Sequence, residues 1–505
     1  MRLRIKNKLT PLISIFVPYG RLLPLCAGIF IAADDQTVIV TVLPDMLTEL
    51  RVGANELNRA SWAITGYLVG YTAVMPFMGQ MSDRFGYRNP FLIALLIFSI
   101  GSAAVALSPQ LPKWVYGGSP ELNWMVGARV FQAIGGGALI PIAIAAAQNL
   151  VDKRHRIIGY GLIGVSFEIG SVIGPLWGGG IAELLSWHWV FWFNIPLALL
   201  VAIWIARDRG IQRFPVRLDV TGVVLFSIAL ILSTIALSRV GRPDGVFIIT
   251  GLSALLTIAI LVVHSYSSKS PIFSSDLFGI RDFTLAITSN FLIGSALIIG
   301  LVTIPLIAAT VYADSTLEGG LRLLRMTVAM GVGALIGGIV TQRLGPTWPI
   351  FTGLLLSIIG FLFLSTWDLS TREPSVTIQV CLAGSGFGIL FAPLSYCALR
   401  LIPVEQKGTG SSLFVSTRMI GMIFGLATIT SIGTVQFTGL ISDLPAISID
   451  SHVQSEINDR AIEAALIVYN NLFKYGAVAL MLAILPSLFL LKSIGFGNGD
   501  LPDTN

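Results

Sequence analysis

Long apolar runs separated by short polar segments recur along the whole chain. Each run holds about 20 residues, which is enough to cross the hydrocarbon core of a bilayer as a helix. The pattern predicts an all-α polytopic membrane protein with fourteen transmembrane helices. We expect them near residues 22–44, 60–81, 90–109, 124–148, 157–181, 187–206, 218–238, 246–264, 283–311, 319–343, 347–366, 377–400, 409–434 and 464–491.

The run from Gly164 to Gly180, GVSFEIGSVIGPLWGGG, differs from the others because it holds a carboxylate, Glu168, near its middle. A charged side chain at that depth is costly and normally faces a cavity or a partner. Glycines recur every fourth residue, which lets a neighbouring helix approach closely, and Pro175 loosens the helix after the acid. A buried ionisable group beside a flexible packing seam therefore indicates a moving membrane protein that handles protons or polar groups.

An internal repeat groups the helices. The loop GQMSDRFGYR, Gly79 to Arg88, follows the second predicted helix, and GIVTQRLGPT, Gly338 to Thr347, follows the tenth. A shift of eight helices is expected from two six-helix halves with an extra pair, helices 7 and 8, inserted between them. Parallel repeats of this kind are a transporter architecture, with the substrate path between the halves.

The predicted domain organisation follows from this grouping. Residues 1–21 form a cytoplasmic N-terminal lead-in, although their basic and apolar pattern also imitates a signal peptide. Residues 22–206 form the N-terminal half and 207–282 the inserted pair with its flanking loops. Residues 283–492 form the C-terminal half, with a long outer link at 435–463, and 493–505 form a cytoplasmic tail.

Composition agrees with a membrane protein, because 54% of the 505 residues are hydrophobic and only 12% are charged. Most of the 32 Lys and Arg residues fall at one end of the predicted bundle, which places both termini in the cytoplasm and the protein in the cytoplasmic membrane. The net charge is +5, and the basic residues are spread through short loops between apolar runs, so no nucleic-acid partner is predicted. The three cysteines lie in apolar segments without metal-site spacing, so no metal is predicted.

Several motifs carry a resemblance to a known family. The loop motif G-x-x-x-D-R-x-G-x-R is matched by Gly79, Asp83, Arg84, Gly86 and Arg88. The exporter motif of helix 5, G-x-x-x-G-P-x-x-G-G, is matched by Gly170, Gly174, Pro175, Gly178 and Gly179. Further matches begin at Asp35 in helix 1, at Arg129 in helix 4 and at Trp187 in helix 6, where His188 replaces an Arg.

On these residues the chain resembles the major facilitator superfamily, in particular its fourteen-helix drug:proton antiporter branch. Within that branch it is similar to mycobacterial exporters that move triacylglycerides and glycolipids with a periplasmic lipoprotein, because it shares Asp35, Glu168 to Pro175, and Arg418 to Met422 with them. The resemblance implies a proton-coupled secondary exporter that acts as a monomer. Its implied partners are protons, membrane lipids and an amphiphilic or lipid cargo, and an extracytoplasmic lipid carrier if the narrower likeness holds.

Three charged residues form the predicted coupling site. Under the repeat, Glu168 falls within one residue of the position equivalent to Arg418 in the other half. We expect Asp35, Glu168 and Arg418 to form a latch across a central cavity, closed while the acid is ionised; the alternative is a static ion pair. Asp34 and Asp35 point about 100° apart on a helix, and Asp35, which fills the family position, is expected to face the cavity.

Three further predictions concern the helix ends. Arg129 is linked to proton transfer by the resemblance, or else is an interfacial arginine whose charge reaches the membrane surface. The motif Gly79, Asp83, Arg84, Gly86 and Arg88 forms a cytoplasmic gate, or else only marks topology. The last helix has no Gly between Ser455 and Gly476, so it either projects outward by several turns or starts late after a solvated loop.

The function that the sequence favours is proton-coupled export of hydrophobic or amphiphilic compounds. The cargo is either drug-like or a lipid, and a dedicated lipid exporter with an extracytoplasmic acceptor is the main alternative. No G-x-x-x-x-G-K-[ST] loop or H-E-x-x-H motif is present, so no cofactor and no enzymatic activity are predicted. A non-transporting membrane receptor remains the alternative of a different class.

Overall fold

The computed structural model describes residues 19–50, 62–110, 121–151, 156–207, 218–268, 271–273, 275–402, 407–442 and 451–494. These residues form fourteen helices of 18 or more residues, one short helix and one turn of 3-10 helix, and contain no strand. The long helices are α2 (Leu23–Glu49), α4 (Trp62–Phe85), α5 (Arg88–Ala106), α6 (Glu121–Leu150), α7 (Arg156–Leu184), α8 (Trp187–Ala206), α9 (Val220–Leu237), α10 (Gly245–Ser267), α12 (Arg281–Thr310), α13 (Thr316–Leu344), α14 (Thr347–Leu364), α15 (Ser375–Leu399), α16 (Lys407–Leu440) and α17 (Ser451–Ile494). The short elements are α11 (Ser275–Gly279) and η3 (Ser108–Gln110).

The prediction of fourteen spanning helices agrees with this architecture, since each predicted span overlaps one long helix. Thirteen of them are long and apolar enough to cross a membrane. The exception, α4, is interrupted by Pro76 and carries several tyrosines and glycines, which lower its hydropathy. It packs between α6, α9 and α16, so its neighbours surround a helix that is less apolar than the rest.

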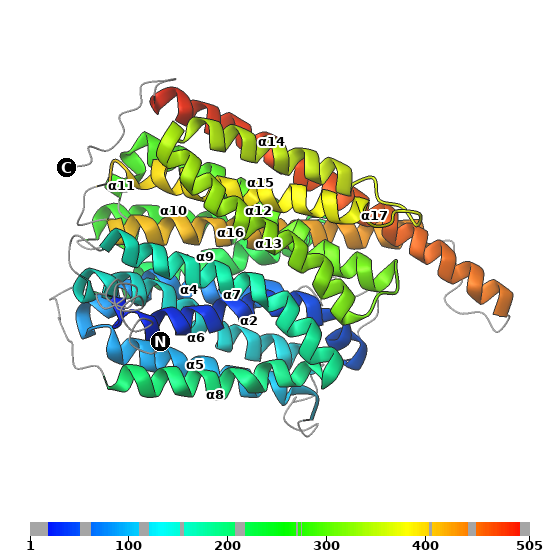
Figure 1. The fold of residues 1–505 in the computed structure, drawn as a ribbon, viewed down its shortest axis with the longest axis horizontal. Coiled ribbons are helices and arrows are strands. Elements are labelled where there is room, and N and C mark those ends of the chain that lie inside the picture. Colours follow the sequence, from blue (N-terminus) through cyan, green and yellow to red (C-terminus); the bar gives the residue numbers. More distant parts are fainter. Residues whose placement is uncertain are drawn as a thin grey trace, which may run out of the picture.

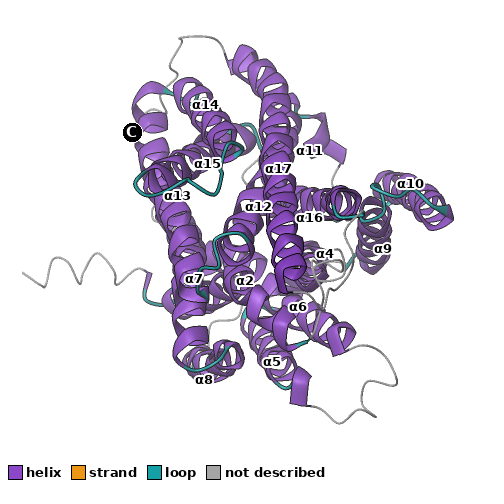
Figure 2. Cartoon of the chain, turned by 90° about the vertical axis from the view of Figure 1, so that its right-hand side faces the viewer, coloured by secondary structure: helices purple, strands orange, loops and turns teal. Residues whose placement is uncertain are grey.

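The helices assemble into two halves with an inserted pair beside them. In Figure 1 the blue to green helices α2 and α5–α8 lie below the yellow-green to red helices α14–α17. The pair α9 and α10 stands at the side of both halves in Figure 2, with α9 packed against α4 of one half and α16 of the other. The exact domain boundaries predicted from the sequence stay a prediction.

The two halves repeat the same backbone contacts. Gly86 after α4 and Gly345 after α13 both adopt φ of 79°, a left-handed conformation that glycine tolerates best. These are the two glycines that the sequence repeat aligns. The repeat is therefore present in the turn geometry as well as in the sequence.

The repeat also fixes which residues of the two halves correspond. A Cβ on Gly170 would lie 2.4 Å from the Phe30 carbonyl oxygen, and one on Gly421 would lie 2.0 Å from that of Phe291. One turn further on, Gly174 approaches the carbonyl of Asp34, and Gly425 approaches that of Ser295. The same seam thus joins α7 to α2 and α16 to α12, with Asp34 and Ser295 in equivalent places.

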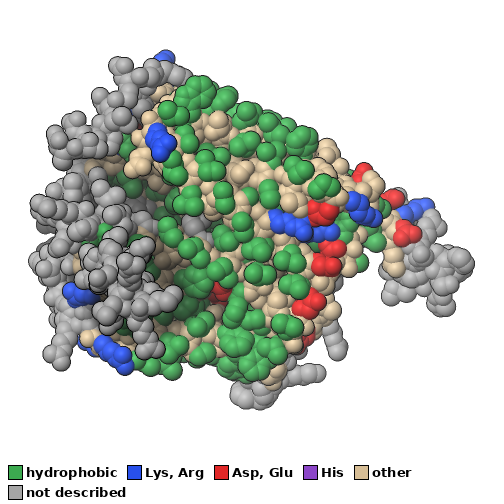
Figure 3. Space-filling view, viewed as in Figure 1, with side chains coloured by type: hydrophobic (Ala, Val, Ile, Leu, Met, Phe, Trp, Pro, Cys, Tyr) green, Lys and Arg blue, Asp and Glu red, His purple; other side chains and the backbone are tan. Residues whose placement is uncertain are grey.

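The two ends of the bundle differ in how the halves meet. We call the end where α2 begins and α17 finishes the inner end, following the predicted topology, and the opposite end the outer end. At the outer end the Thr316 hydroxyl donates to Asp45 (2.8 Å) and the Leu317 N–H to Glu183 (3.3 Å), so α13 is tied to α2 and α7. The face in Figure 3 is hollowed between the halves toward the inner end, which describes an outer-closed conformation.

The last helix extends beyond the other helices, and the direction of that extension, toward the outside of the cell, stays a prediction. α17 has 44 residues, about 66 Å at 1.5 Å per residue, against a hydrocarbon core of about 30 Å. Its first turns extend past the other helices at the right of Figure 1, where Asn458, Asp459 and Arg460 are exposed. The predicted link at 435–463 is shorter than expected, because α16 continues to Leu440 and α17 already begins at Ser451.

Candidate functional site

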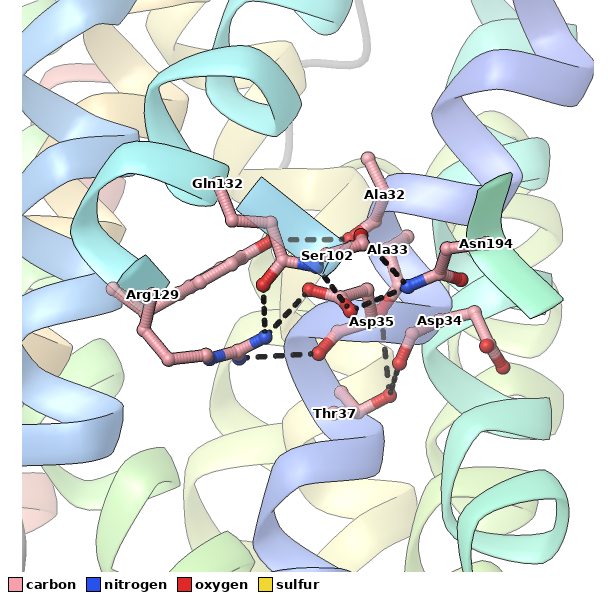
Figure 4. Close-up of polar contacts among 10 residues, drawn as sticks. Ala32, Ala33, Asp34, Asp35, Thr37, Ser102, Arg129, Gln132 and Asn194 are labelled. Carbon is pink, nitrogen blue, oxygen red and sulfur yellow. Dashed lines mark hydrogen bonds and ion pairs between the residues drawn. The ribbon is translucent and has the colours of Figure 1, made fainter. Parts of the chain in front are cut away.

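A buried ion pair occupies the interior of the N-terminal half. Arg129 Nη1 of α6 lies 2.8 Å from Asp35 Oδ2 of α2, and neither side chain is exposed (Figure 4). Because both charges lie in a region from which water is excluded, each depends on the other for compensation. Removing either one would leave an uncompensated charge inside the half.

Polar side chains from three helices complete the shell around the Asp35 carboxylate. Gln132 Nε2 and Asn194 Nδ2 donate to Asp35 Oδ1 at 2.9 and 2.8 Å. Gln132 also donates to Ser102 Oγ (2.7 Å) and accepts from Arg129 Nη1 (2.6 Å). All of these groups donate to the carboxylate, so its buried oxygens are satisfied within the N-terminal half.

Aromatic rings close the site around the guanidinium. The Arg129 guanidinium carbon lies 4.1 Å from the centre of the Tyr67 ring and 5.4 Å from that of Phe191. Cation–π contact of this kind stabilises the cation after it has lost its hydration shell. Arg129 is thus an interior residue, and the alternative in which it reaches the membrane surface does not describe this structure.

The direction of Asp35 differs from our expectation. We expected it to face the central cavity, but α2 is turned so that Asp35 points to α6 and α8 while Gln36 and Thr37 reach the space between the halves. Its recorded partners all belong to the N-terminal half, so Asp35 is not part of a latch between the halves in this conformation. A role in proton coupling stays a prediction.

A small central pocket lies between the halves. Its walls are mainly apolar, with three methionines and a single cationic side chain. They are formed by Gln36, Thr37, Phe167, Ser171, Val172, Leu297, Leu301, Thr327, Met330, Arg418, Met419 and Met422. Both halves contribute, so a bound molecule would contact each of them.

Arg418 is the cation of this pocket. Its guanidinium carbon lies 5.4 Å from the centre of the Phe391 ring, and the side chain is half-buried in α16. Glu168 belongs to α7 one turn before Val172, but its side chain lies outside the described residues. The predicted pairing of Glu168 with Arg418 therefore stays a prediction.

The glycine motif of α7 serves two contacts. Gly170, Gly174 and Gly178 pack against α2, where a Cβ on Gly174 would lie 2.1 Å from Thr37 Oγ1. Gly179 packs against the backbone of Leu317, and the Pro175 carbonyl packs against Gly320 of α13. One helix thus touches the N-terminal half along one face and closes the outer end with the other.

The predicted gate motif lies at the inner end. Arg88 Nη2 donates to the Ala206 carbonyl (2.6 Å) and so caps the last turn of α8, while Arg84 is exposed and packs over Phe85. Gly79 has open space around it, and the side chain of Asp83 lies outside the described residues. The contacts of Arg88 stabilise the N-terminal half, and a gating role stays a prediction.

The inserted pair has its own buried acid at the inner end. Asp219 precedes α9, lies 2.7 Å from His264 Nε2 and accepts from the backbone N–H of Gly222 (2.9 Å) and Ile272 (3.1 Å). Burial raises the pKa of Asp219, but these hydrogen bonds outweigh it and hold that pKa below its usual range. The carboxylate therefore joins α9, α10 and the segment that leads to the C-terminal half.

Sequence reasoning did not find the whole network. Asn194 was present only as a letter of the helix 6 motif, and Ser102 and Tyr67 carried no signal. The contact between Asp35 and Arg129 was also not predicted, because 94 positions separate them in the chain. Only the packing of α2 against α6 brings them together.

Comparison with known proteins extends these observations. The profile of the Major Facilitator Superfamily matches residues 25–426. A probable triacylglyceride transporter of Mycobacterium leprae is 31% identical over 504 residues, covering 93% of this chain and 96% of that protein. The triacylglyceride transporter of Mycobacterium tuberculosis is 31% identical over 453 residues, covering 85% of each chain.

Solved structures share the fold at lower sequence identity. An inward-facing, unoccupied bacterial homologue of the human lysosomal transporter Spinster has a TM-score of 0.65 and 14% identity, covering 94% of this chain and 98% of that one. A D-xylose–proton symporter has a TM-score of 0.62 and 15% identity, covering 92% and 96%. At this identity the likeness concerns the fold alone.

Proposed function

This chain belongs to the Major Facilitator Superfamily, and from that premise we propose that it exports lipids, with triacylglyceride-like neutral lipids as cargo, driven by protons. The observation that carries the proposal is the central pocket, whose wall is apolar apart from a few hydroxyls, Gln36 and Arg418. Such a wall suits acyl chains, and the names of relatives that match most of the chain favour lipid over drug.

The pocket chemistry fits a cargo with long apolar parts and a weakly polar centre. Met330, Met419 and Met422 are flexible and polarisable, so they adapt to chains of different shape. Arg418 offers N–H donors to carbonyl or phosphate oxygen. Sugars and nucleotides would need many more fixed hydrogen-bonding groups than this wall supplies.

Proton coupling is supported by the ionisable groups inside the membrane. Carboxylates in spanning helices are rare, and those in transporters commonly belong to proton relays. Asp35 with Arg129, and Glu168 with Arg418, are the groups we assign to coupling. Movement of α7, which contacts both halves, would connect protonation of these acids to opening of the outer end.

The remaining parts of the proposal concern location and partners. We assign the protein to the cytoplasmic membrane as a monomer, with both termini in the cytoplasm, because the basic residues gather at the inner end. The exposed, charged first turns of α17 would then lie outside the membrane. They offer a surface on which an extracytoplasmic lipid carrier could accept the cargo.

Transport in proteoliposomes with an imposed pH gradient tests this proposal. A fluorescent triacylglyceride and a fluorescent cationic dye would be followed for the wild type, Glu168→Gln, and Asp276→Asn as a control at an exposed acid. We expect gradient-driven lipid movement that Glu168→Gln abolishes and Asp276→Asn leaves unchanged. Dye movement without lipid movement would instead indicate a multidrug antiporter. A lipid flux that does not depend on the pH gradient would contradict proton coupling.

A further inference from the structure

A second acid lies beside the buried ion pair and has no part in it. Asp34 is 7% exposed, and its side chain points to the opposite side of α2 from Arg129 (Figure 4). Within the described parts of the chain, its Oδ1 receives no hydrogen bond. We propose that Asp34 is a second proton-binding carboxyl, which carries a proton in this outer-closed conformation and exchanges it with the central pocket.

The contrast with its neighbour supports this assignment. Asp35 has a cation and two amide donors around it, which compensate a charge on its buried carboxyl. Asp34 is buried almost as deeply, and among the described residues no such donor to its Oδ1 is found. An ionised carboxylate in that position would carry a large desolvation cost, which the group avoids by taking up a proton.

The charged groups on the helices packed against α2 have other places or partners, and those of α4, Asp83 and Arg84, lie in its last turn at the inner end. The charge of Asp35 is balanced by Arg129 on α6, and α8 has no charged residue between His188 and Arg207. On α12 none occurs after Asp282. The acid of α7 in this region is Glu168, whose side chain lies outside the described residues.

Two basic residues of α13, which also packs against α2, have acidic partners of their own near the outer end, and the third, Arg343, lies in the last turn at the inner end. Arg322 pairs with Asp314, and Arg325 pairs with Glu373. None of these cations is therefore placed to balance a charge on Asp34.

The equivalent position of the other half holds an uncharged side chain. Ser295 occupies the place of Asp34 in the seam between α12 and α16, and its hydroxyl donates to the Gly421 carbonyl (2.9 Å). That site is satisfied without any charge. A purely structural role in the seam thus needs only a small hydroxyl, and the carboxyl of Asp34 adds an exchangeable proton.

A short route joins Asp34 to the pocket. Thr37 lines the pocket, and its hydroxyl lies 3.2 Å from the Asp34 carbonyl and 3.1 Å from that of Ser171. Thr37 thus lies between the Asp34 backbone and the pocket, and we place proton exchange between the carboxyl and pocket water at this point. Cargo that displaces this water would slow proton exchange, so cargo and proton would compete, as antiport requires.

Infrared difference spectroscopy on the purified full-length protein at neutral pH tests the assignment. The wild-type spectrum minus that of Asp34→Asn should contain a protonated-carboxyl band, and the same subtraction with Asp276→Asn should contain only ionised carboxylate bands. If Asp34→Asn removes ionised carboxylate bands instead, the proposal is wrong. If Asp34→Asn does not fold, Asp34→Glu should shift the frequency of the protonated band, and an unshifted band would overturn the proposal.

The role of this proton in transport rests on the proposed proton-coupled export, but its presence on Asp34 does not. The band reports the proton on Asp34 whether or not lipid moves. A flux that ignores the pH gradient while the band is present would refute the exporter mechanism and leave the protonation of Asp34 standing. A gradient-driven flux in a protein that lacks the band would support the exporter mechanism and refute the protonation of Asp34.

Discussion

In the N-terminal half, α2 and α6 enclose Asp35 and Arg129, whereas the equivalent positions of α12 and α15 hold Ala296 and Val380. The register follows from matched contacts: Gly174 and Gly425 approach Asp34 and Ser295, and Gly101 and Gly360 approach Gln132 and Ala383. By the same register Ser102 corresponds to Phe361. Every polar member of the network on α2, α5 and α6 is thus replaced by a buried apolar side chain.

The comparison separates what the fold requires from what the function requires. Both halves keep the glycine seams and fully buried interiors, so helix packing does not depend on the charges. The C-terminal half has its own acid–arginine pair, Asp282 and Arg400 (2.6 Å), but it lies at the inner end and Arg400 is 25% exposed. We infer that the charge inside the N-terminal half is retained for transport.

The largest expected effect comes from removing one charge of the buried pair. Arg129→Leu leaves Asp35 ionised without a cation, and breaking a buried pair in this way costs about 3–5 kcal/mol of folding free energy. Arg400→Leu also leaves a buried acid, Asp282, but should cost less, because the guanidinium that it removes is 25% exposed and partly solvated. Thermal unfolding in detergent would measure both, and equal losses would contradict the distinction between the two pairs.

Overpacking the two seams should have a smaller effect that is similar in both halves. A Cβ at Gly174 would lie 2.1 Å from Thr37 Oγ1, and one at Gly425 would lie 2.5 Å from the Ser295 carbonyl. Each alanine variant should lose about 1–3 kcal/mol. Gradient-driven flux should fall further in Gly174→Ala than in Gly425→Ala, since the seam at Gly174 borders Asp34. Equal flux in the two variants, at equal amounts of folded protein, would contradict this expectation.

Ser295→Ala tests the neutral counterpart of Asp34. The hydroxyl lies between two carbonyl oxygens, so its loss should cost about 0.5–1.5 kcal/mol and leave the response to a pH gradient intact. Unfolding and flux measured on the same preparation would check this. A loss of coupling in Ser295→Ala would mean that both halves handle the proton.

The smallest effect is expected outside both halves, at Asp219. Because its folded-state pKa lies below the usual value, its contribution to stability is present above about pH 4 and is lost as pH falls through the folded-state pKa. Asp219→Asn should therefore flatten the acid limb of the stability profile. Unfolding temperatures measured from neutral to acid pH would show it, and an unchanged acid limb would count against this account of Asp219.

Much of the fold could be predicted from the sequence. Apolar runs gave the fourteen helices, and the matched loops ending in Gly86 and Gly345 gave the repeat, because both signals are local. The extension of α17 followed from a stretch without Gly between Ser455 and Gly476.

The candidate site was less accessible to sequence reasoning. Asp34 and Asp35 do point in different directions on α2, as predicted. The rotation of α2 about its axis decides which of them contacts Arg129. That rotation depends on contacts with α6, α7 and α8, which lie far away in the sequence. For the same reason, Ser102 and Asn194 could not be placed beside Asp35 in advance.

The most direct test of the account is to give the N-terminal half the residues of its counterpart. Asp35→Ala with Arg129→Val removes both charges together, while Gln132 and Asn194 keep Ser102 as a partner. Triacylglyceride flux under a pH gradient would be measured for this variant beside the wild type, with its folding checked by thermal unfolding. The account predicts a folded protein whose flux no longer responds to the gradient, and a folded variant with wild-type gradient-driven flux would contradict it.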